Sequence, residues 1–246
     1  MTTTEAAVAA RTENATKVYG TGDAEVRALD GVTAAFPKGE FTAIMGPSGS
    51  GKSTLLHCMA GLDRLTDGSA YIGEVELGSL KEKDLTLLRR KSVGFIFQAF
   101  NLIPTLSAAE NIALPLSIAG DKPDESWRSQ VVGAVGIEDR LKHRPSELSG
   151  GQQQRVAAAR ALVSRPEIVF ADEPSGNLDS TAGEELLGFM RTAVDEYGQT
   201  ILMVTHDPKA ASYADRVIFL KDGMIVDELA DPDAGHIYDK LKSLEA

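Results

Sequence analysis

The chain has 246 residues, of which 43% are hydrophobic, so it can form one packed domain and global disorder is excluded. Acidic residues outnumber basic ones 36 to 25. The resulting net charge of −11 opposes binding of nucleic acid or anionic lipid through the overall field of the chain. A single cysteine, Cys58, excludes an intramolecular disulfide and is expected to be a small buried hydrophobe.

The N-terminal region is expected to contain a tail followed by short strands. The first fifteen residues lack a basic start and an apolar block, so we expect a mobile tail rather than a secretory signal, and a cytosolic chain. No apolar run is long enough to predict a transmembrane helix. Residues 15–45 contain β-like runs, and EFTAIM (40–45) predicts a buried strand that leads into a glycine-rich loop. Helical spacing follows and ends at Gly61.

Strand-like and helix-like segments alternate through the rest of the chain. A second apolar strand, SVGFIF (92–97), precedes a mainly helical region, and residues 181–198 predict an amphipathic helix. Its apolar side carries Leu186, Leu187, Met190 and Val194. The remaining strand candidates are EIVFADEP (167–174), TILMVTH (200–206) and the hairpin RVIFLKDGMIVDE (216–228), which turns at Asp222-Gly223. This alternation predicts a mostly parallel sheet covered on both faces, with residues 89–165 as a helical insertion.

The loop GPSGSGKS, from Gly46 to Ser53, predicts a phosphate site. It matches G-x-x-x-x-G-K-[ST] at every position and lies between a predicted strand and a predicted helix, which argues against a chance glycine-rich loop. Its glycines let the backbone wrap phosphates, while Lys52 can reach the β- and γ-phosphates and Ser53 can hold Mg²⁺. The expected nucleotide contacts are Gly46, Pro47, Ser48, Gly49, Ser50, Gly51, Lys52, Ser53 and Thr54.

Two adjacent acids complete this predicted site. Asp172 and Glu173 follow four apolar residues of a buried strand, at the end where open α/β sheets place ligands. We expect Asp172 to be a Mg²⁺ ligand and Glu173 to be the general base for the attacking water. The two carboxylates repel each other unless a cation screens one of them, so a bound metal explains their pairing better than an exposed acidic loop does.

Several further motifs give the chain a family resemblance. The segments are KVYG (17–20), FQ (97–98), LSGGQ (148–152), SGNLDS (175–180) and VTHD (204–207). With the phosphate loop, they resemble the nucleotide-binding subunit of an ATP-binding-cassette (ABC) transporter over residues 16–228. The resemblance implies a P-loop NTPase core with a mainly parallel sheet (1–88 and 166–246), an N-terminal antiparallel β subdomain, and an inserted α-helical subdomain (89–165) that carries the signature LSGGQ.

The resemblance also explains a second phosphate cradle that has no lysine. In the family, two cassettes pair head to tail, and each ATP lies between the P-loop of one copy and the signature of the other. Ser149, Gly150, Gly151 and Gln152 would then bind the partner's γ-phosphate at a helix N-terminus. The remaining implied roles are Tyr19 stacking on adenine, Gln98 reaching Mg²⁺ or the water, Asp179 bridging the subunits, and His206 contacting the γ-phosphate. His57 and His143 are expected to be ordinary residues.

The implied partners are a second copy of the chain and a transmembrane permease subunit, with no nucleic acid. The chain would lie on the cytoplasmic face of the cell membrane. The apolar segment 99–116 can be core or a groove for a coupling helix. The motifs look most like the branch of macrolide exporters and lipoprotein-releasing systems, although Ser175 replaces a common threonine. The alternatives are a regulatory ATPase of a cell-envelope or division complex, a soluble ATPase acting on nucleic acid or ribosomes, and a P-loop kinase, which the signature disfavours.

Overall fold

The computed structural model describes residues 7–245, which form two sheets and the helices packed on them. The first sheet is antiparallel with the order β2-β1-β4-β5. The second has the order β10-β9-β3-β8-β7-β6, and its neighbours are parallel except for the pair β9 and β10. The strands are β1 (Val8–Tyr19), β2 (Val26–Pro37), β3 (Phe41–Met45), β4 (Asp67–Ile72), β5 (Val75–Glu76), β6 (Val93–Phe97), β7 (Ile168–Asp172), β8 (Ile201–Val204), β9 (Arg216–Lys221) and β10 (Met224–Ala230). The predicted α/β class, with a mainly parallel sheet and an N-terminal antiparallel sheet, is confirmed.

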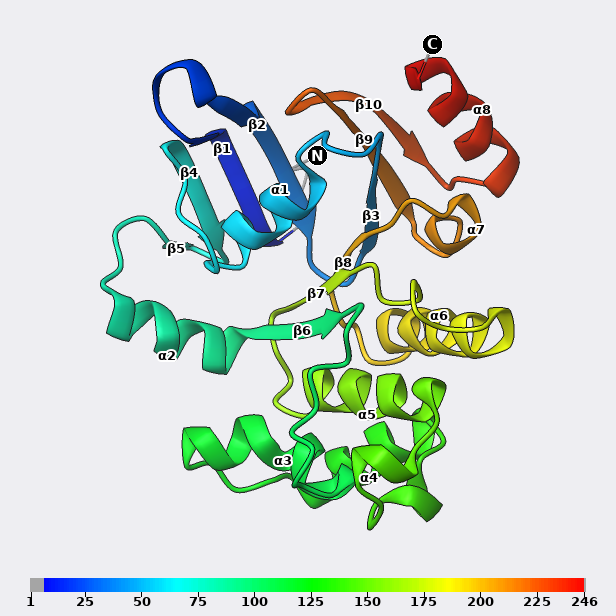
Figure 1. The fold of residues 1–246 in the computed structure, drawn as a ribbon. Coiled ribbons are helices and arrows are strands. Elements are labelled where there is room, and N and C mark those ends of the chain that lie inside the picture. Colours follow the sequence, from blue (N-terminus) through cyan, green and yellow to red (C-terminus); the bar gives the residue numbers. More distant parts are fainter. Residues whose placement is uncertain (1–6, 246) are drawn as a thin grey trace, which may run out of the picture.

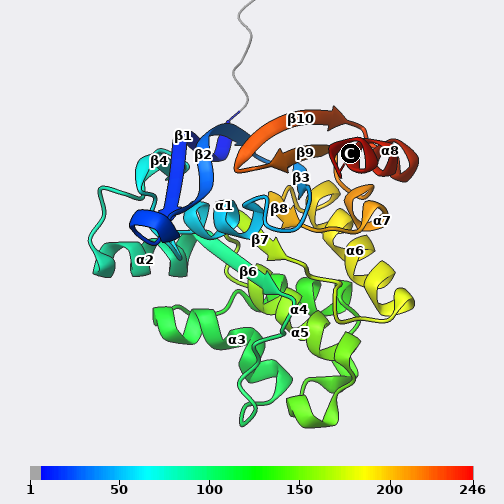
Figure 2. The same ribbon diagram turned by 45° about the horizontal axis from the view of Figure 1, so that its top comes forward.

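Helices lie between the two sheets and around them (Figure 1). Helix α1 lies between the two sheets and packs on strands of both, whereas α3, α4 and α5 form a separate layer beyond β6 (Figure 2). The helices are α1 (Lys52–Met59), α2 (Glu82–Ser92), α3 (Ala108–Ala119), α4 (Glu125–Ala134), α5 (Gly150–Leu162), α6 (Ser180–Asp195), α7 (Pro208–Ala211) and α8 (Ala234–Glu245).

Alternate residues of the central strands face two different hydrophobic cores. In β3, Phe41, Ala43 and Met45 pack toward α5 and α6, whereas Ile44 packs toward α1. This period of two is the geometry of a strand, and both faces of β3 are buried. The side of α6 that carries Leu186, Leu187, Met190 and Val194 is buried, as its spacing predicts.

The prediction of a mobile N-terminal tail is wrong for residues 8–15. They form the first two thirds of β1, which pairs with β2 on one side and β4 on the other. Ala9, Ala10 and Ala15 are fully buried. Alanine has little intrinsic preference for strands, so pairing with two distant segments stabilises this strand where the local sequence does not. Residues 1–6, the rest of the predicted tail, lie outside the described residues.

The helical region begins later than residue 89. That residue lies inside α2, and the following strand β6 pairs with β7 in the core sheet, so the helices α3 to α5 occupy residues 108–162. The predicted hairpin is confirmed: Met224 pairs with Lys221 across the two-residue turn. Asp222 and Gly223 both have positive φ (50° and 76°), as a tight hairpin turn of this kind requires.

Candidate active site

The carboxyl ends of four parallel strands bring the predicted catalytic residues together. Phe97 of β6, Asp172 of β7 and Val204 of β8 are register partners. Gln98, Glu173 and His206 therefore follow neighbouring strand ends that lie level with one another. The phosphate loop begins at Gly46, directly after β3, so it belongs to the same edge of the sheet.

The phosphate loop has the backbone conformation that its glycines permit. Gly51 has φ +100°, and a Cβ there would lie 2.2 Å from the carbonyl oxygen of Ala28, so only glycine fits at the start of α1. Lys52 Nζ donates to the carbonyl oxygens of Gly46 and Pro47 at 2.9 and 2.8 Å, which curls the loop around the ammonium group. Burial lowers the pKa of Lys52, against the opposing field of Glu173 and Asp172.

Ser53 and Asp172 lie together as the sequence predicts. Ser53 Oγ donates to Asp172 Oδ1 at 3.1 Å. The hydroxyl and the carboxylate are hard oxygen ligands beside a phosphate loop, and Mg²⁺ commonly takes one or two protein ligands together with substrate phosphates. Residues 7–245 contain no group of three or more His, Cys, Asp or Glu side chains placed to hold a metal by themselves. The oxygens of Ser53 and Asp172 fit a Mg²⁺ ion that also binds the phosphates of a nucleotide.

His57, expected to be an ordinary residue, lies beside the candidate metal ligand Asp172. His57 Nε2 lies 3.5 Å from Asp172 Oδ2, the carboxylate oxygen that Ser53 does not contact. The hydrogen bond to Asp172 raises the pKa of His57, although burial opposes this. His57 lies four residues after Ser53 on α1, so one face of this helix supplies both contacts. That spacing was the available sequence signal.

Glu173 and His206 form a direct pair. His206 Nδ1 lies 2.8 and 2.9 Å from the two carboxylate oxygens of Glu173. Glu173 has φ 49°, an uncommon conformation for a non-glycine residue, and its backbone N–H donates to Val204 O at 2.9 Å. This conformation, held by the neighbouring strand, places the Glu173 side chain beside the imidazole rather than along the strand.

Gln98 contacts the segment that precedes α6 rather than Asp172. Gln98 Nε2 donates to Asn177 Oδ1 at 3.2 Å, and Asn177 Nδ2 donates to Gln98 O at 3.0 Å. A Cβ on Gly176 would lie 2.9 Å from Gln98 Nε2, so glycine leaves the space that the amide occupies. Asn177 was missed by sequence reasoning, because nothing local to SGNLDS indicates a contact 79 residues away.

The signature segment forms a second, separate site. Ser149 caps α5: its Oγ accepts from Gln152 N at 3.3 Å, and Gln152 Oε1 accepts from Ser149 N at 2.9 Å. The backbone N–H groups of Gly150 and Gly151 in the first turn have no intrahelical acceptor, which is the arrangement that binds anions. Ser149 and Asp179 line one pocket of about 440 Å³, and no residue of the 46–54 loop contributes to it.

Gln154 joins the signature helix to the strand ends. It is fully buried, and its Nε2 donates to Phe97 O at 3.1 Å and Pro174 O at 2.5 Å. Phe97 directly precedes Gln98, and Pro174 directly follows Glu173. The run of three glutamines in the sequence gave no sign of which one is buried, because that depends on how α5 packs under the sheet edge.

Comparison with known proteins decides the family. The family model described as ABC transporter matches residues 29–176. The chain belongs to the ABC transporter family. Among curated relatives, the bacitracin export ATP-binding protein BceA of Halalkalibacterium halodurans is 48% identical over 223 residues, which cover 89% of this chain and 88% of BceA. The macrolide export ATP-binding/permease protein MacB of Hyphomonas neptunium is 45% identical over 90% of this chain and 35% of MacB.

A solved structure has the same fold. The ATP-binding cassette MJ0796, in a dimeric post-hydrolysis state bound to ADP and Pi, superimposes with a TM-score of 0.81 at 41% identity. The match covers 91% of this chain and 99% of MJ0796, a protein of Methanocaldococcus jannaschii. This ABC subunit therefore binds and hydrolyses ATP. Within residues 7–245, no helix of the ABC subunit has the length and apolar character needed to cross a membrane.

Proposed function

We propose that two copies of this ABC ATPase pair head to tail and close around two Mg·ATP. One observation carries the proposal: a single chain holds two phosphate-binding loops that line different sites, and only one of them has a lysine. The signature loop of a second copy would complete the ATP site at the P-loop of the first. A two-fold interface repeats each contact and so yields two complete sites. The dimeric assembly of the relative MJ0796 supports this arrangement.

Each side chain then has a defined task in hydrolysis. Lys52 stabilises charge on the β- and γ-phosphates, Ser53 and Asp172 hold Mg²⁺, and Glu173 accepts the proton of the attacking water. A Mg²⁺ ion there would neutralise phosphate charge and align the phosphate oxygens. His206 orients Glu173 and reaches the γ-phosphate, while Tyr19 stacks on adenine. The other copy contributes Ser149, Gly150, Gly151 and Gln152, and Asp179 lies at the interface between the two copies.

The γ-phosphate acts as a bridge between the two copies. It is bound from both sides before hydrolysis, so ATP favours the closed dimer, and loss of the bridge lets the copies separate. Converting a mostly open population to a mostly closed one requires about 5.5 kcal/mol of differential affinity. Charge-assisted hydrogen bonds of roughly 1.5–3 kcal/mol each, made across two sites, are sufficient.

We further propose that a separate transmembrane permease receives this motion. The helical region 89–165, apart from β6, is proposed as the signature subdomain that moves against the core formed by 1–88 and 166–246. Between β6 and this region lies a cavity of about 300 Å³ lined by Phe95, Phe97, Pro115 and Arg160, which has room for apolar side chains of a partner helix. Arg160 holds the adjoining loop through the carbonyl oxygens of Phe100 and Asn101.

We propose export or mechanotransmission at the cytoplasmic face of the membrane as the work of this subunit, and the names of the relatives support export. MacB is named as an ATP-binding/permease protein, and the match covers 35% of its length, which supports a permease as the functional partner of this ABC subunit. BceA is named for bacitracin export. A regulatory ATPase of a cell-envelope complex would use the same site. Stimulation of ATP hydrolysis by a transported substrate in the reconstituted complex separates the two.

Mixing two inactive variants tests the shared site. Lys52→Ala removes the P-loop charge, and Ser149→Asp keeps a good helix cap while placing a negative charge against the γ-phosphate. Each variant alone is expected to be inactive. A mixed dimer has one pocket with both defects and one intact pocket, so an equal mixture recovers about a quarter of wild-type ATP hydrolysis by random pairing. The double variant in one chain is the control and stays inactive. Absence of rescue, with mixed dimers shown by copurification of two tags, would refute the shared site.

Asn177→Ala tests the contact with Gln98. The change removes both hydrogen bonds to Gln98, and we expect kcat for ATP hydrolysis to fall about fivefold because the amide is no longer placed for the water or metal. In a Gln98→Ala background the same change should have no further effect on kcat. Equal losses in both backgrounds would mean that Asn177 acts independently of Gln98.

A further inference from the structure

An ion pair between the buried Lys17 and the half-buried Asp63 lies beside the ring of Tyr19. Lys17 Nζ donates to Asp63 Oδ1 at 2.7 Å and to Arg64 O at 2.7 Å. Tyr19 Oη donates to the other oxygen, Asp63 Oδ2, at 2.7 Å. Lys17 is only 9% exposed. The carboxylate of Asp63 thus joins β1, which carries Lys17 and Tyr19, to the segment that follows α1.

The two faces of the Tyr19 ring have different surroundings. Lys17 Nζ lies over the ring, 4.7 Å from its centroid, so a cation covers the inner face. The residue is nevertheless 41% exposed. Its cross-strand partner on β2, Val26, is 61% exposed, and opposite residues in an antiparallel pair project to the same side. Together they form an exposed apolar platform at the end of the hairpin.

The protonation states make the Tyr19–Asp63 hydrogen bond a strong one at neutral pH. Burial and the hydrogen bond to Asp63 raise the pKa of Tyr19 to about 12, although a hydrogen bond from Thr54 of the phosphate loop lowers it. Burial acts to raise the pKa of Asp63, but hydrogen bonds from Lys17, Tyr19 and the backbone of Arg64 lower it overall. The phenol remains a donor and the carboxylate remains an ionised acceptor.

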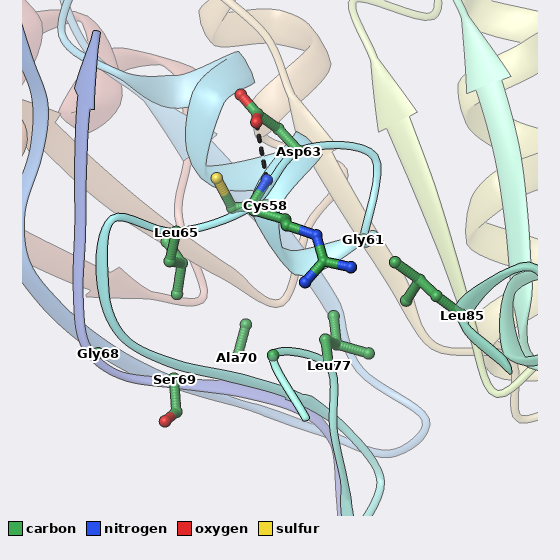
Figure 3. Close-up of a pocket in the computed structure, with 11 residues that line it drawn as sticks. Cys58, Gly61, Asp63, Leu65, Gly68, Ser69, Ala70, Leu77 and Leu85 are labelled. Atoms are coloured by element: carbon green, nitrogen blue, oxygen red, sulfur yellow. Dashed lines mark hydrogen bonds between the residues drawn. The ribbon is translucent and has the colours of Figure 1, made fainter. Parts of the chain in front are cut away.

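The Asp63 carboxylate is held in place by its own backbone neighbour as well as by Lys17 and Tyr19. Asp63 lies at the rim of a cavity of about 140 Å³, and its carboxylate points away from Leu65 and Leu77, which line the apolar part (Figure 3). Besides the two side-chain bonds, Asp63 Oδ1 accepts the backbone N–H of Arg64 at 2.7 Å (Figure 3). This local bond fixes the carboxylate, so Asp63 provides a rigid acceptor for the phenol.

We propose that Asp63 is a positioning residue for nucleotide binding, which sets the plane of the Tyr19 ring so that its free face receives the adenine base. The inference rests on the proposed stacking role of Tyr19. Asp63 does not touch the nucleotide; it holds the ring through the hydroxyl, and Lys17 covers the face that the base does not use. The phosphates are bound by the separate P-loop, so Asp63 affects recognition of the base and leaves phosphate chemistry unchanged.

A double-variant cycle tests this inference. Tyr19→Phe removes the Tyr19–Asp63 hydrogen bond and Asp63→Asn weakens it, so each should raise KM for ATP roughly three- to tenfold and leave kcat at saturating ATP unchanged. If Asp63 acts through the Tyr19 hydroxyl, the double variant should be no worse than the more affected single variant. Inorganic tripolyphosphate, which has no base, should compete for the site equally well in all variants. Asp67→Asn, a nearby exposed charge removal, is the matched control with unchanged KM.

The possible results separate a failure of the positioning role of Asp63 from a failure of the stacking role of Tyr19. Additive effects on KM, or an equal loss of tripolyphosphate binding, would overturn the positioning role, because Asp63 would then act on the fold or on the P-loop. An unchanged KM in Asp63→Asn would also overturn it, provided that Tyr19→Ala still raises KM. If Tyr19→Ala leaves KM unchanged, the proposed stacking role of Tyr19 fails instead. Thermal unfolding of each variant separates a loss of stability from a loss of nucleotide affinity.

Discussion

Glu173→Gln is expected to bind ATP and fail to hydrolyse it. Glutamine has the shape of glutamate and can still hydrogen-bond to His206, but it cannot accept the proton of the attacking water. Loss of general-base catalysis lowers kcat by about 10²- to 10⁴-fold. Because ATP is retained, the closed dimer should accumulate. Phosphate release measures the first effect, and size-exclusion chromatography with and without ATP measures the second.

The control for this variant is Glu167→Gln. Glu167 precedes β7, at the opposite end of the strand from Glu173, and it contacts Ser92 and Lys38. Its replacement should leave kcat within about a factor of two, because an exposed ion pair far from the site contributes little free energy. Normal turnover by Glu173→Gln would remove Glu173 from the role of base. The His206–Glu173 contact would then need a different explanation.

Lys52→Ala is expected to lose nucleotide affinity before any effect on chemistry can be seen. Lys52 supplies the charge for the β- and γ-phosphates, and charge-assisted bonds of roughly 1.5–3 kcal/mol each correspond to about a ten- to hundredfold rise in Kd per bond. The same ammonium group holds the carbonyl oxygens of Gly46 and Pro47, so its loss also loosens the loop that wraps the phosphates. Equilibrium binding of a fluorescent ATP analogue measures the change in Kd.

Lys38→Ala is the matched control for charge. Lys38 is exposed and pairs with Glu167, away from the phosphate loop, so its removal should not change Kd for ATP. If Lys52→Ala bound ATP as tightly as wild type, the loop would have to hold the phosphates through backbone N–H groups alone. A normal Kd with a lowered kcat would mean that Lys52 stabilises the transition state of hydrolysis rather than bound ATP.

Local motifs predicted the fold class, and the structure brings the candidate site residues of several motifs to one edge of the sheet. The P-loop, the buried strand before Asp172 and the turn at Asp222-Gly223 each carry their information in a few consecutive residues, because backbone conformation and strand period are local properties. The error at β1 has the opposite origin. The alanines of residues 8–15 have no local strand signal, and strands β2 and β4, up to about sixty residues away, hold them in place.

The sequence by itself determined that this chain is an ABC ATPase with one lysine-bearing phosphate loop and one signature loop, since those motifs are short and their chemistry depends on residue type. Only the tertiary structure decided which groups meet. His57 beside Asp172, Asn177 on Gln98, and Asp63 under Tyr19 are contacts between segments that sequence spacing does not relate. They arise because level strand ends and a helix packed between two sheets bring distant residues within hydrogen-bond distance.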